Sequence, residues 1–331
     1  MQDFDLHMHT TYCDGNDSAE DMVRSAIEKG LKTVGLSGHS FTPHDPSYCM
    51  SRENTLKYID EVRRLKEKYA ESINVLLGLE LDYYADTDTS PYDYLIGSVH
   101  YMFTPEGRAK RDRILASDRI DVLSLTELIK FSDWSDIDDE PFDMRQFALT
   151  RGVDMLSVAE LFYETEADII KQTDCDIIGH FDLVTKFNER YRYKEDGTVV
   201  DLWKMGKDLP GEAKHQQKAG QVERTEEEAL FSFFDTEDER YVKAWKKAVD
   251  RIFADCAERC KNGYRNRLEK LGVLEAGDKP VFEINYGAVA KGYRTTPYPA
   301  QDQIDYIKSK GGILIFSSDS HRVDTIINTL V

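Results

Sequence analysis

Long apolar runs, a leader segment and a cysteine framework are all missing from this sequence. No stretch approaches the roughly 18 consecutive apolar residues that a membrane span needs, and the first residues lack the basic and apolar segments of a secretory signal. The five cysteines are an odd number without the regular spacing of a disulfide scaffold. We therefore expect a reduced, cytoplasmic protein that has no membrane partner.

Positive charge is also scarce, because 43 basic side chains stand against 62 acidic ones and the net charge is −19. This balance argues against nucleic acid or an anionic membrane surface as the main partner. A small phosphorylated metabolite remains a suitable partner, since a few local cations or metal ions can bind it. With 331 residues, 40% of them hydrophobic, the chain can bury a large core.

Seven short apolar segments with the character of buried strands alternate mostly with helical patterns. Strands are expected near residues 3–7, 33–37, 74–81, 94–99, 175–180, 281–285 and 313–316. Helices are expected near residues 18–30, 51–71, 153–173, 239–261 and 299–310. Such alternation predicts an α/β fold with parallel strands joined by right-handed crossovers. A closed barrel and an open doubly wound sheet both fit, but polar residues at so many strand ends favour the barrel, where they converge on one point.

Two irregular regions interrupt the alternation, at about residues 103–150 and 184–238. The first begins basic and becomes acidic, and the second is polar and rich in lysine and glutamate. Their charge runs are most simply solvated faces, so we predict a single domain over residues 1–331 with two insertions. Only ten residues follow His321. A helix that covers the last strand needs more, so we expect a truncated or unusually short C-terminus.

The histidines are the chemically informative feature of the sequence. His7 and His9 stand two apart, so in a strand their imidazoles point to the same face. Six of the eight histidines lie at or just past the C-terminal end of a predicted strand; they are His7, His9, His39, His100, His180 and His321. Any one of them alone is more simply a core or surface histidine, but six at matching positions indicate a common site.

Carboxylates extend this set to nine candidate metal ligands. Glu80 and Asp319 occupy equivalent strand-end positions, and Asp14 lies in the turn after the first strand. Nine ligands exceed the three or four that one zinc ion needs, so two or three ions are implied, with Glu80 able to bridge two of them. Mixed imidazole and carboxylate ligands suit zinc, manganese or iron, and argue against calcium or a thiolate cluster.

This ligand set predicts hydrolysis of a phosphate monoester. A water between two cations has a lowered pKa and supplies hydroxide near neutral pH. The candidate catalytic residues are Asp319, Glu80 and His180, first as ligands and, for Asp319 and the histidine, also as groups that shuttle protons. Phosphate oxygens not held by metal require arginine or lysine; Arg190, Arg192 and Arg294 follow strand ends, although each is more simply an ordinary surface cation.

The ordered segments HMHTTYCDG, GLSGHS, GLELDYY, IGSVHY, IIGHFDL, EIN and SSDSH resemble the polymerase-and-histidinol-phosphatase (PHP) superfamily, most closely its monofunctional histidinol-phosphatase branch. The resemblance spans residues 7 to 321. It implies a distorted seven-stranded TIM-like barrel with three metal ions. One ion would take His7, His9, Glu80 and Asp319; a second would share Glu80 and take His100 and His180; the third would take Asp14, His39 and His321.

The resemblance also implies a substrate, L-histidinol phosphate, whose cationic amine Asp82 could meet. Two positions depart from the family pattern, because Gly38 stands where many members have an acid, and Asp14 where many have a histidine. Another hydrolase reaction on a small phosphate ester, a nucleotide or phosphotyrosine stays open, as does a non-catalytic metal-binding protein that uses the acidic segment near 132–143 as a partner surface. An exonuclease is disfavoured, because no basic aromatic track is visible.

Overall fold

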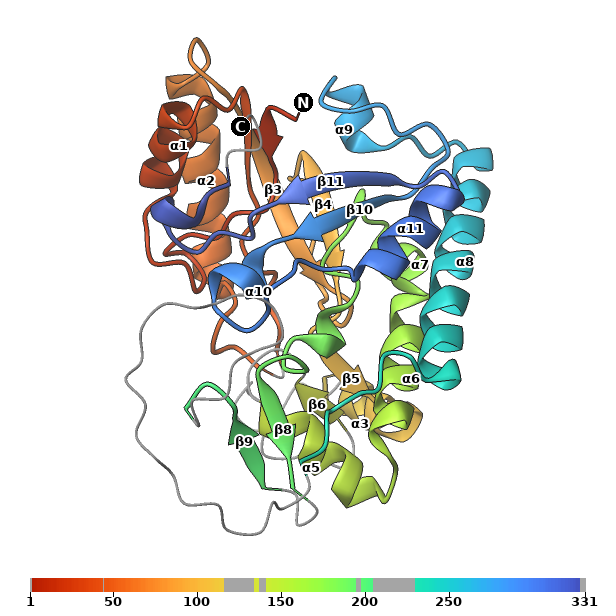
Figure 1. The fold of residues 1–331 in the computed structure, drawn as a ribbon. Coiled ribbons are helices and arrows are strands. Elements are labelled where there is room, and N and C mark those ends of the chain that lie inside the picture. The colour runs from red at the N-terminus through yellow and green to blue at the C-terminus, as the bar shows by residue number, and fades with distance from the viewer. Residues whose placement is uncertain are drawn as a thin grey trace.

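Seven parallel strands form one sheet that curves into a nearly closed barrel, as predicted (Figure 1). The computed structural model describes residues 2–43, 45–115, 134–136, 141–194, 198–204 and 230–327. The strand order is β1-β2-β3-β4-β7-β10-β11. Their bounds are β1 (Phe4–Asp5), β2 (Thr33–Leu36), β3 (Asn74–Asp82), β4 (Tyr94–Ser98), β7 (Ile177–Ile178), β10 (Val281–Asn285) and β11 (Ile313–Ser317).

The barrel closes just beyond the ends of β1 and β11. Met8 and Ser320 form a parallel bridge there. The His9 amide donates to the Ser320 carbonyl at 2.8 Å, and the Ser320 amide donates to the His7 carbonyl at 3.2 Å. This closure places the first and last histidine segments of the chain side by side.

Helices cover the outside of the barrel on two opposite sides (Figure 1). On one side lie α1 (Ala19–Glu28) and α2 (Arg52–Lys68), and on the other lie α6 (Met155–Glu166), α7 (Ile169–Thr173), α8 (Glu239–Lys261) and α11 (Gln301–Ser309). The single helix expected over 153–173 is two helices, because Asp168 leaves the helical region with ψ near 2° and pairs with Arg251 at 3.1 Å. Within the described part of the chain, we find no helix with the length and apolar character of a membrane span.

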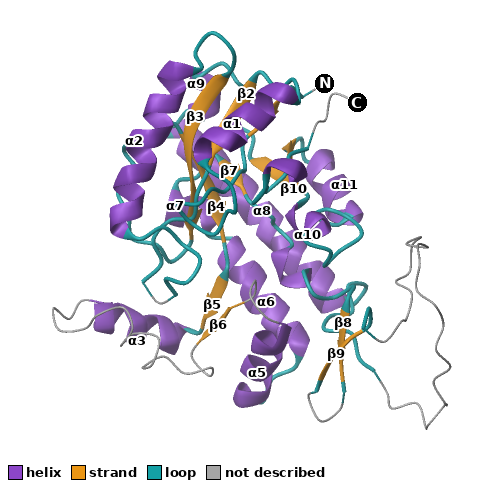
Figure 2. Cartoon of the chain, turned by 90° about the vertical axis from the view of Figure 1, so that its left-hand side faces the viewer, coloured by secondary structure: helices purple, strands orange, loops and turns teal. Residues whose placement is uncertain are grey.

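The two predicted insertions leave the barrel after β4 and β7 and lie together below it (Figure 2). The first contains β5 (Tyr101–Phe103), α3 (Pro105–Leu115), β6 (Trp134–Asp136) and α5 (Pro141–Arg151). The second contains the short helix η1 (Leu183–Thr185) and the strands β8 (Tyr191–Tyr193) and β9 (Val199–Asp201). β5 pairs with β6 and β8 with β9, each antiparallel. Half of the acidic segment near 132–143, together with His44 and His215, lies outside the described residues.

Three short helices complete the part of the chain that the structure describes. They are α9 (Arg267–Lys270), α10 (Gly287–Ala290) and η2 (Val323–Thr325). α10 directly follows β10, so its residues lie at the C-terminal end of the barrel strands. η2 packs on α1, where the Ser25 hydroxyl donates to the Val323 carbonyl at 3.0 Å.

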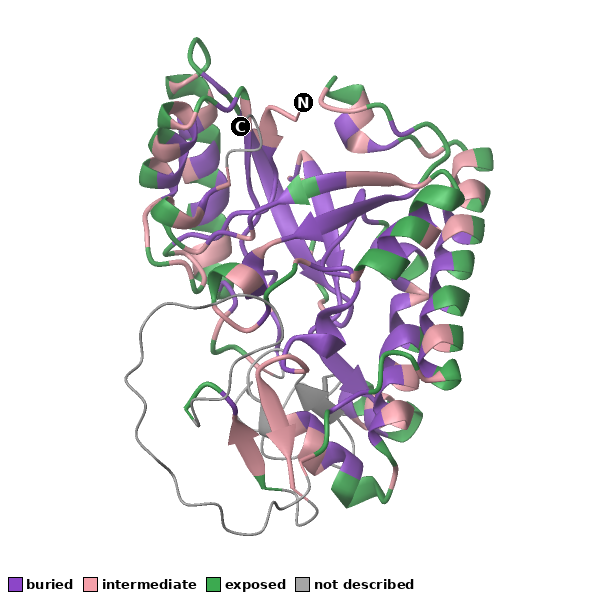
Figure 3. Ribbon diagram, in the orientation of Figure 1, coloured by how far each residue is buried: buried purple, intermediate pink, exposed green. Residues whose placement is uncertain are grey.

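The barrel interior is a packed apolar core, and the strands that form it are buried along most of their length (Figure 3). Tyr94 fills its centre, and its hydroxyl donates to the Leu6 carbonyl. Gly78 on the neighbouring strand β3 and Gly35 on β2 make room for this ring, because a Cβ on Gly78 would lie 2.2 Å from Tyr94 Cζ. The core therefore fixes the spacing of the strands whose ends carry the histidines.

We expect Gly78→Ala to lower the free energy of unfolding by about 1–3 kcal/mol, since the added methyl group overpacks the core against the Tyr94 ring. Urea unfolding measures this change. In a Tyr94→Leu background the same substitution should cost clearly less, because the clashing ring is gone. Equal costs in both backgrounds would contradict this explanation.

Candidate metal centre

The Glu80 carboxylate lies at the centre of the site, and five histidines surround it. β3 carries it to the C-terminal end of the barrel, where it is 1% exposed. Its Oε2 lies near three ring nitrogens, those of His7 at 3.1 Å, His9 at 3.4 Å and His39 at 3.0 Å. Its Oε1 lies 3.3 Å from His100 Nε2 and 2.9 Å from His180 Nε2. One buried charge is thus shared by five imidazoles from four strand ends, since His7 and His9 both follow β1.

Asp319 forms a second group with the two histidines of the first strand. Its Oδ1 lies 3.7 Å from His7 Nε2 and 3.2 Å from His9 Nε2. The backbone of Asp319 is left-handed, with φ near 50°. Gly287 at the start of α10 leaves room for this carboxylate, because a Cβ there would lie 2.4 Å from Asp319 Oδ2.

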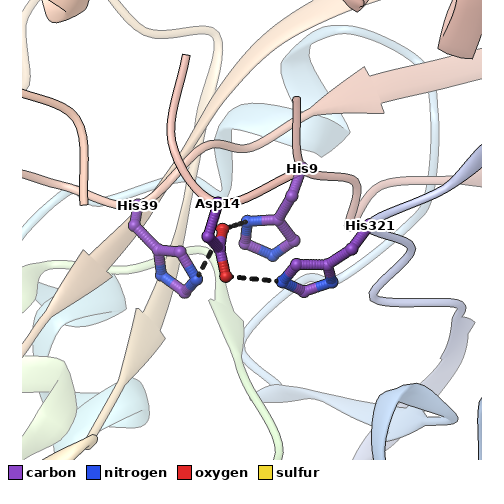
Figure 4. A group of neighbouring side chains, drawn as sticks. All are labelled: His9, Asp14, His39 and His321. Carbon is purple, nitrogen blue, oxygen red and sulfur yellow. Dashed lines mark hydrogen bonds and ion pairs between the residues drawn. The ribbon is translucent and has the colours of Figure 1, made fainter. Parts of the chain in front are cut away.

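Asp14 forms a third group with three histidines (Figure 4). Its Oδ2 lies 2.9 Å from His321 Nε2, and its Oδ1 lies 3.6 Å from both His9 Nδ1 and His39 Nε2. The His9 and His321 rings stack with centroids 4.1 Å apart. The structure therefore brings all nine predicted ligands together. His9 lies in all three of these groups, and His7 and His39 each lie in two, so the sharing is wider than the assignment to three separate ions suggests.

Several buried atoms at the centre make no hydrogen bond within the described residues. They are His7 Nε2, His9 Nε2, Glu80 Oε2 and His180 Nδ1. Leaving such atoms unsatisfied costs about 1–3 kcal/mol each. Imidazole nitrogens and carboxylate oxygens that approach one another without bonding are suited to share divalent cations, so these residues fit the metal ions that the sequence implies.

The electrostatics of the centre keep the carboxylates ionised. Burial favours the neutral form of Glu80, but the surrounding histidines outweigh burial and hold its pKa well below the usual value. Burial also lowers the pKa of His7, yet the carboxylates of Glu283 and Glu80 outweigh it and raise the pKa well above the usual value. Burial and the neighbouring His321 and His39 lower the pKa of His9 to about 3. In the metal-free protein, protons on some of the histidines thus balance the buried carboxylates.

Three further side chains orient the ligands, and the sequence interpretation did not assign them this role. Glu283 on β10 is fully buried and accepts a hydrogen bond from His7 Nδ1 at 2.8 Å. Asp82 lies 3.2 Å from His100 Nδ1, and the Ser98 hydroxyl donates to Glu80 Oε1 at 2.7 Å. Such partners fix which ring nitrogen faces a metal. The signal for Glu283 in the sequence was a carboxylate inside an apolar strand, at the EIN segment. The same kind of signal identified Glu80 in its own strand.

Gly38, one of the two departures from the family pattern, lies in a tightly packed position. A Cβ there would lie 3.3 Å from Met50 Sδ and 3.4 Å from Cys13 Sγ. A side chain at this position would therefore require the Met50 and Cys13 side chains to move. Cys13 fills part of this space, and burial raises the pKa of its thiol to about 12, so it stays protonated.

The pocket above the ligands contains lysines in place of the three predicted arginines. Its described lining adds Leu183, Lys186, Gly287, Ala288, Lys291 and Tyr298 to the ligands. Arg190 pairs with Asp201 at 2.9 Å, Arg192 donates to the Asn188 carbonyl at 2.7 Å, and the buried Arg294 donates to Thr185. A substrate role for these arginines and for Asp82, which is 2% exposed, therefore stays a prediction.

We expect Glu283→Gln to weaken zinc binding about 10- to 100-fold, because the neutral side chain orients His7 less firmly and makes it a weaker ligand. Competition with a chromophoric chelator measures the affinity. Glu53→Gln on the exposed face of α2 is the matched control and should leave it unchanged. Equal affinities for Glu283→Gln and the parent protein would show that Glu283 does not support the centre.

Histidinol-phosphatases are among the curated proteins that are similar to this chain in sequence. The Bacillus subtilis histidinol-phosphatase is 31% identical over 123 residues, which cover 31% of this chain and 46% of that protein. A probable histidinol-phosphatase of Deinococcus radiodurans is 29% identical over 109 residues, 30% of this chain and 42% of that protein. The chain therefore aligns with less than half the length of these curated relatives.

Two solved structures share the fold along nearly the whole chain. A candidate histidinol phosphatase from Listeria monocytogenes superposes with a TM-score of 0.59 at 16% identity, covering 98% of both chains. The histidinol phosphate phosphatase of Lactococcus lactis gives 0.51 at 15% identity, covering 97% of this chain and 87% of the other. The PHP domain model matches residues 5–205, more than half of the sequence. On this match and on the shared barrel, the chain belongs to the PHP domain family.

Proposed function

We propose that the chain is a metal-dependent phosphatase that hydrolyses L-histidinol phosphate to L-histidinol and phosphate. The observation that carries this proposal is the cluster of nine imidazole and carboxylate side chains at the C-terminal end of the barrel. Six of the nine are buried, and several of their atoms have no hydrogen-bond partner among the described residues. The names of the relatives support the choice of histidinol phosphate as the substrate. The structure of the Lactococcus lactis protein has been determined with zinc, L-histidinol and phosphate.

The nine residues would hold two or three zinc, manganese or iron ions. His7, His9, Glu80 and Asp319 would hold one, Glu80 with His100 and His180 a second, and Asp14, His39 and His321 a third. The observed distances between these side chains support the grouping. Bound ions supply positive charge for the phosphate oxygens and a water that ionises near neutral pH.

Asp319 is the group best placed to take part in proton transfer. Burial alone would raise its pKa, but His7, His9 and Lys291 outweigh burial and hold the pKa well below the usual value, so the carboxylate is ionised. It lines the pocket and is therefore within reach of a water there. Its Oδ2 accepts a hydrogen bond from Asn285 at 3.3 Å, which helps to fix its orientation.

One relative points to a second candidate reaction. The DNA polymerase and 3′-5′ exonuclease PolX of Bacillus subtilis is 25% identical over 130 residues, 36% of this chain and 22% of that protein. The net charge of −19 opposes a nucleic-acid substrate, because binding to a phosphate backbone depends on positive charge. Single-stranded DNA therefore belongs in the assay as a competing substrate, and we expect no cleavage of it.

We expect the protein purified without chelator to contain two or three transition-metal ions per chain by elemental analysis. Because His7 and His100 hold protons in the metal-free protein, metal binding should release protons, and the apparent affinity should rise with pH. Calorimetry in buffers of different ionisation enthalpy measures the release. A reproducible content below one ion, unchanged after zinc or manganese is added, would exclude a multinuclear centre.

The substrate is tested by comparing kcat/KM for histidinol phosphate with that for sugar phosphates, nucleotides and phosphotyrosine. We expect Asp82 to bind the amine of the substrate. Histidinol phosphate should then be preferred about ten- to a hundredfold over a phosphate ester that has no amine, since a charged hydrogen bond contributes about 1.5–3 kcal/mol. His180→Ala should abolish turnover. His215→Ala, in a polar segment outside the described residues, should leave it unchanged. A faster competitor ester would overturn the substrate assignment and leave the phosphatase proposal standing.

A further inference from the structure

The described part of the pocket wall that holds no metal ligand comes from two loops at the same end of the barrel. The β7 loop (residues 181–189) carries Leu183 and Lys186. The β10 loop (residues 286–300), which includes α10, carries the other lining residues, among them Tyr298. The two loops are far apart in the sequence, so the shape of this wall depends on side chains that join them.

A buried carboxylate anchors the first of these loops. Asp182 lies two residues after the ligand His180 and is only 1% exposed. Its Oδ1 accepts hydrogen bonds from the hydroxyls of Tyr163 on α6 at 2.6 Å and Tyr241 on α8 at 2.7 Å. Burial and the charge of Asp182 raise the pKa of both tyrosines well above the usual value, so both hydroxyls keep their protons and donate. The outer helices thus fix one oxygen of Asp182.

Arg294, on the β10 loop, binds the other oxygen of this carboxylate. Its Nη1 donates to Asp182 Oδ2 at 3.4 Å and also to the Thr185 hydroxyl. Its guanidinium carbon lies 4.5 Å from the centre of the Tyr298 ring, and its Nε lies 3.6 Å from Glu189 Oε1. A planar guanidinium suits this place, because its edge donates hydrogen bonds while its face stacks on a ring. One side chain therefore contacts the β7 loop and a ring that lines the pocket.

The surroundings of Arg294 are those of a residue that acts through its neighbours. It is 7% exposed, and it does not belong to the described lining of the pocket. A direct contact with phosphate would require the guanidinium to leave Asp182 and Glu189, which costs the buried Asp182 its charge partner. Tyr298, in contrast, lines the pocket, and its backbone pairs with Asn285 at the end of β10.

We propose that Arg294 is a positioning residue, which holds the β7 loop against the β10 loop and so sets the shape of the wall that receives the substrate. The part that concerns the substrate rests on the proposed phosphatase function. The ligand His180 is held separately, by Glu80 at its ring and by Glu283 at its amide. A looser wall should therefore weaken substrate binding more than the chemical step, which raises KM and leaves kcat nearly unchanged.

Hydrogen exchange tests the link between the loops without any substrate. The amides of Thr185 and Tyr298 each donate to a backbone carbonyl at 3.0 Å, so both are protected in the parent protein. Arg294→Met removes a charged hydrogen bond between the loops, so exchange in both loops should become about ten- to a hundredfold faster. Exchange in α2 should not change. Arg64→Met on the exposed face of α2 is the matched control and should leave both loops as protected as in the parent.

The same variants test the effect on the substrate in the zinc-loaded protein. For Arg294→Met, KM for histidinol phosphate should rise about tenfold or more, while kcat and zinc content stay close to the parent values. Arg294→Lys keeps the charge beside Asp182 but lacks the planar face that stacks on Tyr298. Its exchange and its KM should lie between those of the parent and Arg294→Met. If Arg294→Met does not fold, Arg294→Lys decides the question alone.

Exchange as slow as in the parent in both loops would overturn the link, and faster exchange with an unchanged KM would overturn its role in substrate binding. Loss of zinc together with a fall in kcat would also contradict the proposal, because Arg294 would then support the metal centre and not the wall. Failure of the proposed function gives a different result. A parent protein that hydrolyses no phosphate ester refutes the reaction, while faster exchange in the two loops of Arg294→Met still supports the link.

Discussion

The structure of the site depends on one buried carboxylate. Glu80 lies in a strand that is apolar on both faces, where an ionised group is costly unless other groups compensate its charge. Five histidines provide that compensation at distances of 2.9 to 3.4 Å. They follow the ends of four different strands, β1, β2, β4 and β7, so the site requires the barrel to bring these strand ends together. The same charge that is costly in the core thus holds the ligands in a single cluster.

Orientation of the ligands comes from a layer of polar groups behind them. Glu283 lies behind His7, Asp82 behind His100, and Ser98 behind Glu80. These groups are buried on rigid strands or directly after them, which leaves the rings little freedom to turn. The pocket side of the cluster is different, since it carries Lys186 and Lys291 on loops.

The sequence was most informative where a polar residue interrupts an apolar strand. Strand periodicity and the position of each histidine predicted the barrel and the grouping of the nine side chains, because parallel strands must end at the same face. The sequence could not predict which carboxylate lies behind which histidine ring. That pairing depends on the direction of side chains on strands that are far apart in the chain. Glu283 was missed for this reason. The arginines were chosen by chain position alone, and their partners in the insertions could not be read from the sequence.

The bridge between Met8 and Ser320 has a consequence for how the protein folds. His9 and Asp14 lie near the start of the chain and His321 near its end, so this group forms only after β1 and β11 have paired. Contacts of such long sequence separation form late, because a large loop must be closed first. During synthesis, a chain that lacks its last strand cannot assemble this ligand group. This group can therefore bind a metal ion only after the barrel has closed. An ion bound there stabilises the closed barrel relative to a barrel whose first and last strands are apart.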